Sequence, residues 1–254
     1  MSDKKTDTAV ILAAGWGSRI QSLGGEEETV SKPLIELGNI PLLTRVVQTL
    51  KKSGITNFVI VTGYLKERVE AVASKLSEKE GVTITPVFNP KWDTLANGVS
   101  LLAAKDVIQG SFVLTMSDHA YDYQIAEQLV NEGAQDKAVR LCIDRKIDEV
   151  FDIDDATKVV TKDDKIVEID KALKNYNALD IGLFFCTTEV FTALQQAYDE
   201  QGDCSLSDGM RKLGENGRFG YMDIEKFWWQ DVDTPETLVH AEKMLAEGQL
   251  RFPD

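Results

Sequence analysis

Short apolar runs alternate with amphipathic segments along residues 1–90. Residues 10–14, 57–62 and 82–88 are apolar runs of strand length, whereas residues 41–52 and 65–76 repeat their apolar positions with the spacing of one helical face. This alternation predicts parallel strands joined by right-handed crossovers, with helices on both faces of the sheet.

The pattern becomes more mixed in the rest of the chain. It predicts strands at 111–116, 138–143, 179–186, 219–224 and 227–230, a hairpin at 157–161 and 165–169, and helices at 97–102, 189–198, 206–213 and after Thr234. Thr234 and Pro235 are typical of a helix start. We therefore predict an α/β fold with a doubly wound, mostly parallel (mixed) sheet and a small β-hairpin extension. Because no linker or repeat interrupts the chain, residues 1–254 are expected to form a single domain.

The composition of the chain disfavours some classes of binding partner. The formal charge is −14, with 43% hydrophobic and 28% charged residues, and no basic stripe suits a nucleic acid or an anionic membrane. No apolar run reaches the roughly eighteen residues of a membrane span, and residues 1–7 lack the apolar core of a secretion signal. The three widely spaced cysteines favour buried thiols in a reducing, cytoplasmic compartment.

The first strand runs into a turn that contains Gly15 and Gly17. Glycines leave the backbone N–H groups free to approach a phosphate, and Arg19 and Lys32 add positive charge on either side of the turn. An ordinary strand-to-loop connection is the simpler alternative. A dinucleotide-binding turn is disfavoured because Ile20 occupies the position of its third glycine.

Residues 12–19 (LAAGWGSR) and 32–34 (KPL) resemble the signature of the sugar-phosphate nucleotidyltransferase family, L-A-A-G-x-G-[ST]-R followed by K-P-L. The resemblance implies transfer of a nucleotidyl group to a phosphate ester with release of pyrophosphate, with residues 1–139 binding the nucleotide and 140–254 the acceptor. Arg19 and Lys32 would hold the triphosphate. The turn would bind substrate through Leu12, Ala13, Ala14, Gly15, Gly17 and Ser18.

The same resemblance implies a Mg²⁺ cofactor held by carboxylates. Asp118 follows an apolar strand and matches the family's first metal ligand, while Asp231 and Asp233 are both candidates for the second. Asp233 could instead flank the cap of the last helix. His119 is expected to form a hydrogen bond or to be structural, because Mg²⁺ prefers oxygen ligands.

Further substrate contacts are implied on both sides of the site. Lys171 matches a lysine that contacts the acceptor phosphate, although a lysine after a strand is often a solvated surface charge. Asn97, Gly98 and Ser100 open a helix near the expected base pocket, where Asn97 could instead cap the helix. Asp180 belongs to the acceptor-binding half.

A narrower resemblance covers nearly the whole chain. Residues 97–98, 144–159 and 231–234, with the segment around Lys171, are similar to CTP:inositol-1-phosphate cytidylyltransferases. This implies CTP and inositol 1-phosphate as substrates, with hand-off of the CDP-alcohol to a separate CDP-alcohol phosphotransferase. The chain differs from these relatives at two places. Its loop between Arg19 and Lys32 is longer and contains glutamates at 26–28, and Ile181 stands where these relatives tend to have threonine.

Other functions stay open at this point. Trp92, Phe227, Trp228 and Trp229 could form a cage for phosphocholine or an aminoalkyl phosphate or phosphonate. A sugar-1-phosphate uridylyl- or guanylyltransferase would use the same signature. A catalytically dead nucleotide sensor is the non-enzyme alternative, but it has no need of the retained cations and carboxylates.

Overall fold

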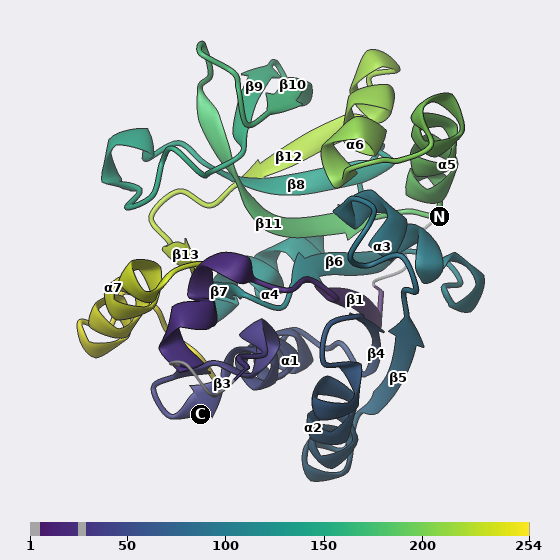
Figure 1. Cartoon of the computed structure of the whole chain (residues 1–254). Coiled ribbons are helices and arrows are strands. Elements are labelled where there is room, and N and C mark those ends of the chain that lie inside the picture. Colours follow the sequence, from purple (N-terminus) through teal and green to yellow (C-terminus); the bar gives the residue numbers. More distant parts are fainter. Residues whose placement is uncertain (1–5, 25–28, 254) are drawn as a thin grey trace.

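The computed structural model describes residues 6–24 and 29–253. A nine-stranded sheet runs through the middle of this part of the chain, in the order β5-β4-β1-β6-β11-β8-β12-β10-β9 (Figure 1). Its strands are β1 (Thr8–Ala13), β4 (Asn57–Thr62), β5 (Thr83–Phe88), β6 (Phe112–Met116), β8 (Val139–Asp144), β9 (Lys158–Lys162), β10 (Lys165–Asp170), β11 (Ala178–Cys186) and β12 (Phe219–Asp223).

The sheet is mixed, as predicted. Strands β5, β4, β1 and β6 are parallel neighbours, and β12 is parallel to β8. Strand β11 lies between β6 and β8 and runs antiparallel to both. The predicted α/β fold with a doubly wound, mixed sheet is confirmed.

The predicted hairpin forms from β9 and β10, and it joins the main sheet. Strand β9 also pairs with β11, where Ala178 lies opposite Val159. Strand β10 meets β12 at Lys165 and Gly220. The strands β11, β8, β12, β10 and β9 therefore close on one another at this end of the sheet, which gives the second half of the molecule a curved wall.

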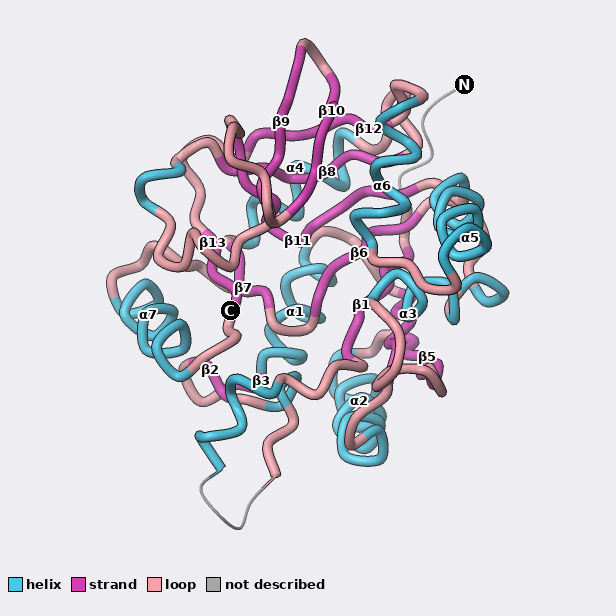
Figure 2. The backbone as a smooth tube through the Cα atoms, turned by 45° about the horizontal axis from the view of Figure 1, so that its top comes forward, coloured by secondary structure: helices cyan, strands magenta, loops and turns pink. Residues whose placement is uncertain are grey.

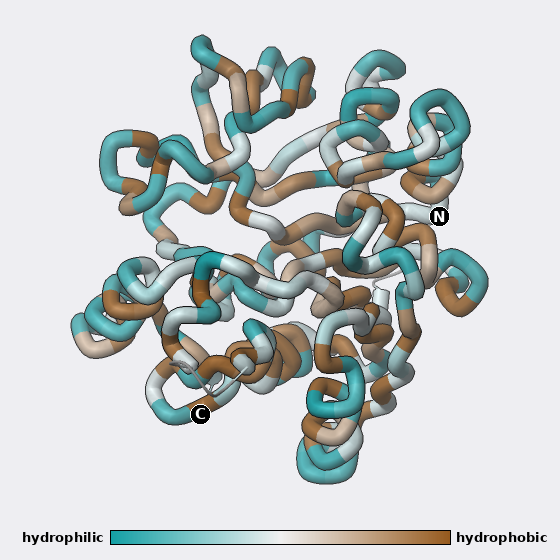
Figure 3. Tube along the Cα trace, in the orientation of Figure 1, coloured by the Kyte–Doolittle hydropathy of each residue, from teal (hydrophilic) through white to brown (hydrophobic). Residues whose placement is uncertain are grey.

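Helices cover both faces of the sheet (Figure 2). Alternate residues of β1 point to opposite faces, so Ile11 packs in one core and Val10 in the other. The first core receives α1 (Leu42–Lys52), α2 (Lys66–Glu80) and α4 (Tyr123–Glu132), and the second α3 (Asn97–Ala103), α5 (Glu189–Gln201) and α6 (Leu206–Glu215). Hydrophobic residues accordingly follow the central strands in Figure 3.

A third, smaller core packs the last helix, α7 (Pro235–Ala246), against the segment that follows β1. Ile20 and Met244 are buried in it. The last short strand, β13 (Trp229–Asp231), begins later than predicted and pairs with β7 (His119–Tyr121) outside the main sheet. The remaining short elements are η1 (Ser18–Gly24), η2 (Lys32–Leu34), β2 (Glu36–Leu37), β3 (Ile40–Pro41), η3 (Lys105–Val107) and η4 (Ile147–Glu149).

Two further expectations from the sequence concern membrane-spanning helices and the glutamates at 26–28. Among the helices of residues 6–24 and 29–253, none combines the length and apolar character needed to cross a bilayer. The glutamates at 26–28 lie outside the described residues.

Candidate functional site

A cavity of about 410 Å³ opens where β1 and β6 end. The carboxyl ends of parallel strands are the usual position of ligand sites in open α/β sheets. Most of the predicted site residues line this cavity: Leu12, Ala14, Gly15, Lys32, Asn97, Ser100, Asp118, Lys171, Asp180, Asp231 and Asp233.

Five predicted residues lie outside the lining of the cavity: Ala13, Gly17, Ser18, Arg19 and Gly98. Ala13 faces the core on the α1 side of the sheet. Gly98 serves packing, because a Cβ there would lie 2.6 Å from the Cys204 carbonyl oxygen and 2.7 Å from that of Ser205. The lack of a side chain at Gly98 permits this close approach between α3 and the start of α6, while its contact with substrate stays a prediction.

The pairing of β7 with β13 brings distant acidic residues together. Asp231 lies opposite His119 in this ladder, and the Val232 backbone N–H donates to the Asp118 carbonyl oxygen at 2.9 Å. Asp233 follows one residue later. Residues 118 and 231–233 thus share one side of the cavity although more than a hundred positions separate them.

Positive side chains reach the same carboxylates. The Lys32 ammonium contacts both Asp118 and Asp233. Arg19 Nη2 lies 2.8 Å from Asp233 Oδ2 and 2.9 Å from Asp155 Oδ2. Lys171 Nζ lies 3.0 Å from Asp155 Oδ1, so cations and carboxylates from both halves of the chain form one connected network.

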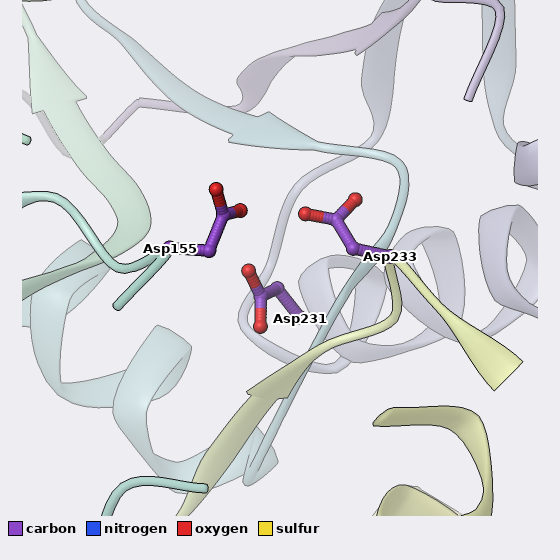
Figure 4. A group of neighbouring side chains, drawn as sticks. All are labelled: Asp155, Asp231 and Asp233. Carbon is purple, nitrogen blue, oxygen red and sulfur yellow. The ribbon is translucent and has the colours of Figure 1, made fainter. Parts of the chain in front are cut away.

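Asp155 is a member of the site that sequence reasoning missed. One carboxylate oxygen from each of Asp155, Asp231 and Asp233 lies within 4.8 Å of the other two (Figure 4). Asp155 comes from the loop between η4 and β9. In the sequence it is one of several acidic residues between positions 148 and 155, so no local signal separates it from its neighbours.

The carboxylates differ in their electrostatic surroundings. Burial opposes the charge of Asp118, but Lys32 and His119 hold the pKa of this carboxyl far below its usual range. Burial also opposes the charge of Asp155, whose pKa is nevertheless lowered by hydrogen bonds from Arg19 and Lys171. At Asp231 burial prevails over the attraction of His119, and the pKa is raised.

His119 has the hydrogen-bonding role expected of it. Its Nδ1 lies 2.7 Å from Asp118 Oδ1, and its ring stacks on Trp229 with the ring centres 6.3 Å apart. Burial lowers the His119 pKa, but the charges of Asp118 and Asp231 together with the hydrogen bond to Asp118 raise it, and the net shift is upward. Gly182, at φ +72°, leaves room for the ring, since a Cβ at this position would overlap the imidazole.

The two glycines of the turn have different tasks. Gly15 has open space where a Cβ would be, which leaves its backbone accessible from the cavity. Gly17 has φ +63°, and a Cβ there would lie 3.0 Å from Cδ of Lys32. Gly17 therefore supports the position of Lys32.

The structure decides one of the two alternatives for Asn97, the helix cap, while its contact with the base stays a prediction. Asn97 does not cap α3, whose N-cap is Ala96; its Oδ1 instead accepts a hydrogen bond from the Leu206 N–H at 2.9 Å. The capping alternative is therefore wrong. Ser100 Oγ accepts a hydrogen bond from Asn89 Nδ2 at 3.0 Å, and both Asn97 and Ser100 line the cavity.

The four aromatic residues considered for a cation cage do not converge. Trp92 and Trp229 line the cavity, whereas Phe227 and Trp228 do not. Lys146 lies over the Trp228 ring at 5.5 Å, and Phe227 faces Lys226 and Arg251. The cage hypothesis is wrong, because the chain's own cations occupy two of the four rings.

The chain matches a known protein family and several curated proteins. The model of the nucleotidyl transferase family matches residues 8–248. Two proteins named bifunctional IPC transferase and DIPP synthase, from Thermococcus kodakarensis and Aquifex aeolicus, are 35% and 32% identical over 96% of this chain. The match covers 52% and 53% of those proteins, so the chain spans about half the length of these curated relatives.

A solved structure has the same fold. The inositol-1-phosphate CTP transferase from T. maritima superimposes with a TM-score of 0.82 at 23% identity. The superposition covers 98% of this chain and all of that one.

Proposed function

Since this chain belongs to the nucleotidyl transferase family, we propose that it transfers a cytidylyl group from CTP to a phosphorylated polyol, inositol 1-phosphate, with release of pyrophosphate. The observation that carries the proposal is the convergence of cations and carboxylates from both halves on one cavity. The names of the curated relatives and of the T. maritima protein support the choice of nucleotide and acceptor.

The proposed reaction is a direct displacement. An acceptor phosphate oxygen attacks the α-phosphorus of CTP, a new P–O bond forms, and the bond to pyrophosphate breaks with its electron pair on the leaving group. Both reactants are anions, so neutralisation and alignment are the main tasks of the protein. Arg19 and Lys32 would bind the triphosphate at the glycine turn, and Lys171 the acceptor phosphate.

The carboxylates fit the divalent cation that this mechanism needs. Mg²⁺ prefers oxygen donors, and Asp118, Asp231 and Asp233 would hold it, with Asp155 in reach of the last two. Asp231 has no ion-pair partner among the described residues and accepts a hydrogen bond only from Gln230 Nε2, so a cation would relieve its unfavourable charge. The chemistry that bound Mg²⁺ supplies is neutralisation of the charge developing on the departing pyrophosphate.

Pyrophosphate release tests the proposal directly. CTP, UTP, GTP and ATP would each be combined with inositol 1-phosphate, glucose 1-phosphate, phosphocholine and aminoethyl phosphate. We expect the highest kcat/KM for CTP with inositol 1-phosphate. Faster release with another pair would identify one of the alternative transferases, and no release with any pair would favour the nucleotide sensor.

The role of Asp118 gives a first mutational prediction. Asp118→Asn removes the charge that faces Lys32 and the proposed metal, so kcat should fall at least about 100-fold with CTP and inositol 1-phosphate. The far-ultraviolet circular dichroism spectrum should stay unchanged. Asp106→Asn, an exposed aspartate on η3, is the matched control and should retain full activity. Near-normal turnover of Asp118→Asn would contradict the proposed site.

The cellular context remains part of the proposal. A reducing, cytoplasmic compartment is supported by the three free, buried cysteines. The CDP-alcohol would pass to a separate CDP-alcohol phosphotransferase.

A further inference from the structure

A histidine outside the cavity contacts both segments that carry the acidic group of Figure 4. His240 lies in the middle of α7 and does not line the cavity. Its ring stacks on Phe151, in the loop that carries Asp155, with the ring centres 4.4 Å apart and the planes 13° apart. Its Nδ1 lies 2.8 Å from Oε1 of Gln230, the residue before Asp231. One imidazole therefore joins the segments that supply two of the three carboxylates.

The hydrogen bonds of Gln230 have a defined direction. This buried side chain donates from Nε2 to the Asp231 carbonyl oxygen at 2.9 Å and to Asp231 Oδ1 at 3.1 Å. A carbonyl oxygen and an ionised carboxylate only accept, so the amide oxygen of Gln230 faces His240, and His240 Nδ1 is the donor. Burial lowers the pKa of His240, as does the charge of Lys243, so the neutral ring uses its single N–H for this bond.

This series of hydrogen bonds sets the direction of the Asp231 carboxylate. Among the described residues, Asp231 forms no ion pair, and Gln230 Nε2 is the donor that its side chain has. A Gln230 amide that lost its bond to His240 would be free to turn over, and Asp231 would then lose its fixed donor. A carboxylate that is already aligned loses less conformational freedom when it binds a cation.

The stack on Phe151 supports the second segment. Phe151 is 52% exposed and lies between η4 and β9, four residues before Asp155. Since stacked aromatic rings attract one another, the contact with His240 ties this loop to α7. Asp155, from the same loop, reaches Arg19 at 2.9 Å across the cavity. The loop is thus held at both ends of this short stretch.

We propose, building on the function proposed above, that His240 is a positioning residue for the divalent cation, which aligns Asp231 through Gln230 and holds the Asp155 loop through Phe151. His240 touches neither the cation nor the substrates. Groups that orient the ligands of a metal typically change its affinity by about 10–100-fold when they are replaced.

Two substitutions separate the two contacts of His240. His240→Phe keeps a ring for Phe151 and removes the N–H, whereas His240→Asn keeps an N–H donor near the position of Nδ1 and removes the ring. Binding of Mn²⁺ alone to the full chain, followed by electron paramagnetic resonance, reports on the carboxylates without turnover. We expect the Kd for Mn²⁺ to rise about tenfold in His240→Phe and about threefold or less in His240→Asn. Val239→Phe, at an exposed neighbouring position of α7, is the matched control and should bind Mn²⁺ as the wild type does.

A double variant tests whether the effect passes through Gln230. Gln230→Met removes the amide at similar length and should raise the Kd for Mn²⁺ by about the same tenfold. Gln230→Met combined with His240→Phe should bind Mn²⁺ no more weakly than either single variant, because both changes break the same series of bonds. Independent contributions to folding would instead add.

The outcomes separate this inference from the proposed function. An unchanged Kd for Mn²⁺ in His240→Phe would overturn the role of His240. Equal losses in His240→Phe and His240→Asn would overturn it too, since packing on α7 would then explain both, and so would absence of Mn²⁺ binding to the wild type. None of these measurements needs CTP or inositol 1-phosphate. The proposed function is judged separately, by pyrophosphate release from the wild type.

Discussion

At the scale of single residues, two carboxylates of the cavity differ in how their charge is balanced by neighbouring groups. Asp118 is matched by Lys32 and His119, so its charged form is favoured. At Asp180 burial disfavours the charged form, and the single hydrogen bond from the Gly182 N–H, with no ion pair within the described residues, does not offset this effect. A fold keeps such an unfavourable charge where function requires it.

This difference predicts how stability depends on pH. The pKa of Asp180 is about 6 in the folded protein and about 3.9 for an unfolded aspartate. Its contribution to stability is therefore fully present below about pH 4 and is lost as the pH rises through 6. Asp180→Asn should raise the free energy of unfolding by about 1–3 kcal/mol at pH 7.5 and change it little near pH 4.

Urea denaturation of the wild type and Asp180→Asn at both pH values would measure this effect. Asp106→Asn should show no such pH-dependent difference. A variant that is less stable than the wild type at pH 7.5 would contradict the account of Asp180 as an unpaired charge.

At the scale of elements, helix caps and strand pairs determine where the site residues lie. Thr234 caps α7: its hydroxyl accepts a hydrogen bond from the Thr237 N–H at 3.2 Å, and the Asp233 N–H donates to Thr237 Oγ1 at 2.9 Å. The cap therefore also orders the backbone of Asp233. The two interpretations of Asp233, as a residue flanking the cap and as part of the site, are compatible.

Removing this cap should weaken the protein measurably. Thr234→Ala is expected to lower the free energy of unfolding by about 1 kcal/mol, because it leaves backbone donors of the first turn unpaired. Thr188→Ala is a matched control, since Thr188 precedes α5 without a side-chain capping bond. The difference between the two variants, measured in urea, isolates the capping bond. Equal losses would show that the cap contributes nothing.

Element boundaries also show where sequence patterns fail. The apolar face of the second helix ends at Leu76, but α2 continues to Glu80 and ends before Gly81 at φ +65°. Exposed final turns need no apolar residue, so periodicity cannot detect them. The glycine is the better end signal, because its left-handed conformation closes the helix.

At the scale of the whole molecule, the two main cores bury all three thiols. Cys142 and Cys186 lie in strands of the central sheet, and Cys204 lies just before α6. Burial raises the pKa of all three, that of Cys204 to about 11. Thiol reagents attack the exposed thiolate, so the folded protein should present none.

Titration with Ellman's reagent checks this expectation. We expect almost no reaction in native buffer at pH 8 and three thiols per chain after unfolding in guanidinium chloride. Fast reaction of one thiol in the folded protein would mean that its core opens readily. In that case the thiol reaction should be repeated with the protein saturated with CTP. The reaction should become slower, because a ligand that stabilises the folded state slows such opening.

The sequence by itself determined the features of this protein that depend on short stretches of chain. The alternation of apolar runs predicted the α/β fold, and the glycine turn with Arg19, Lys32 and Asp118 identified one end of the site, because these signals lie within short stretches of chain. The structure brings these residues together, while their catalytic roles stay predictions.

The tertiary structure decided the rest. Asp155 enters the site only because its loop folds across to Arg19, 136 positions away in the chain. The place of Asp180 in the cavity wall depends on the pairing of β11 with β8, and the failure of the aromatic cage depends on where Lys146 and Arg251 lie. Such contacts join distant segments, and their geometry is determined by packing rather than by any local pattern.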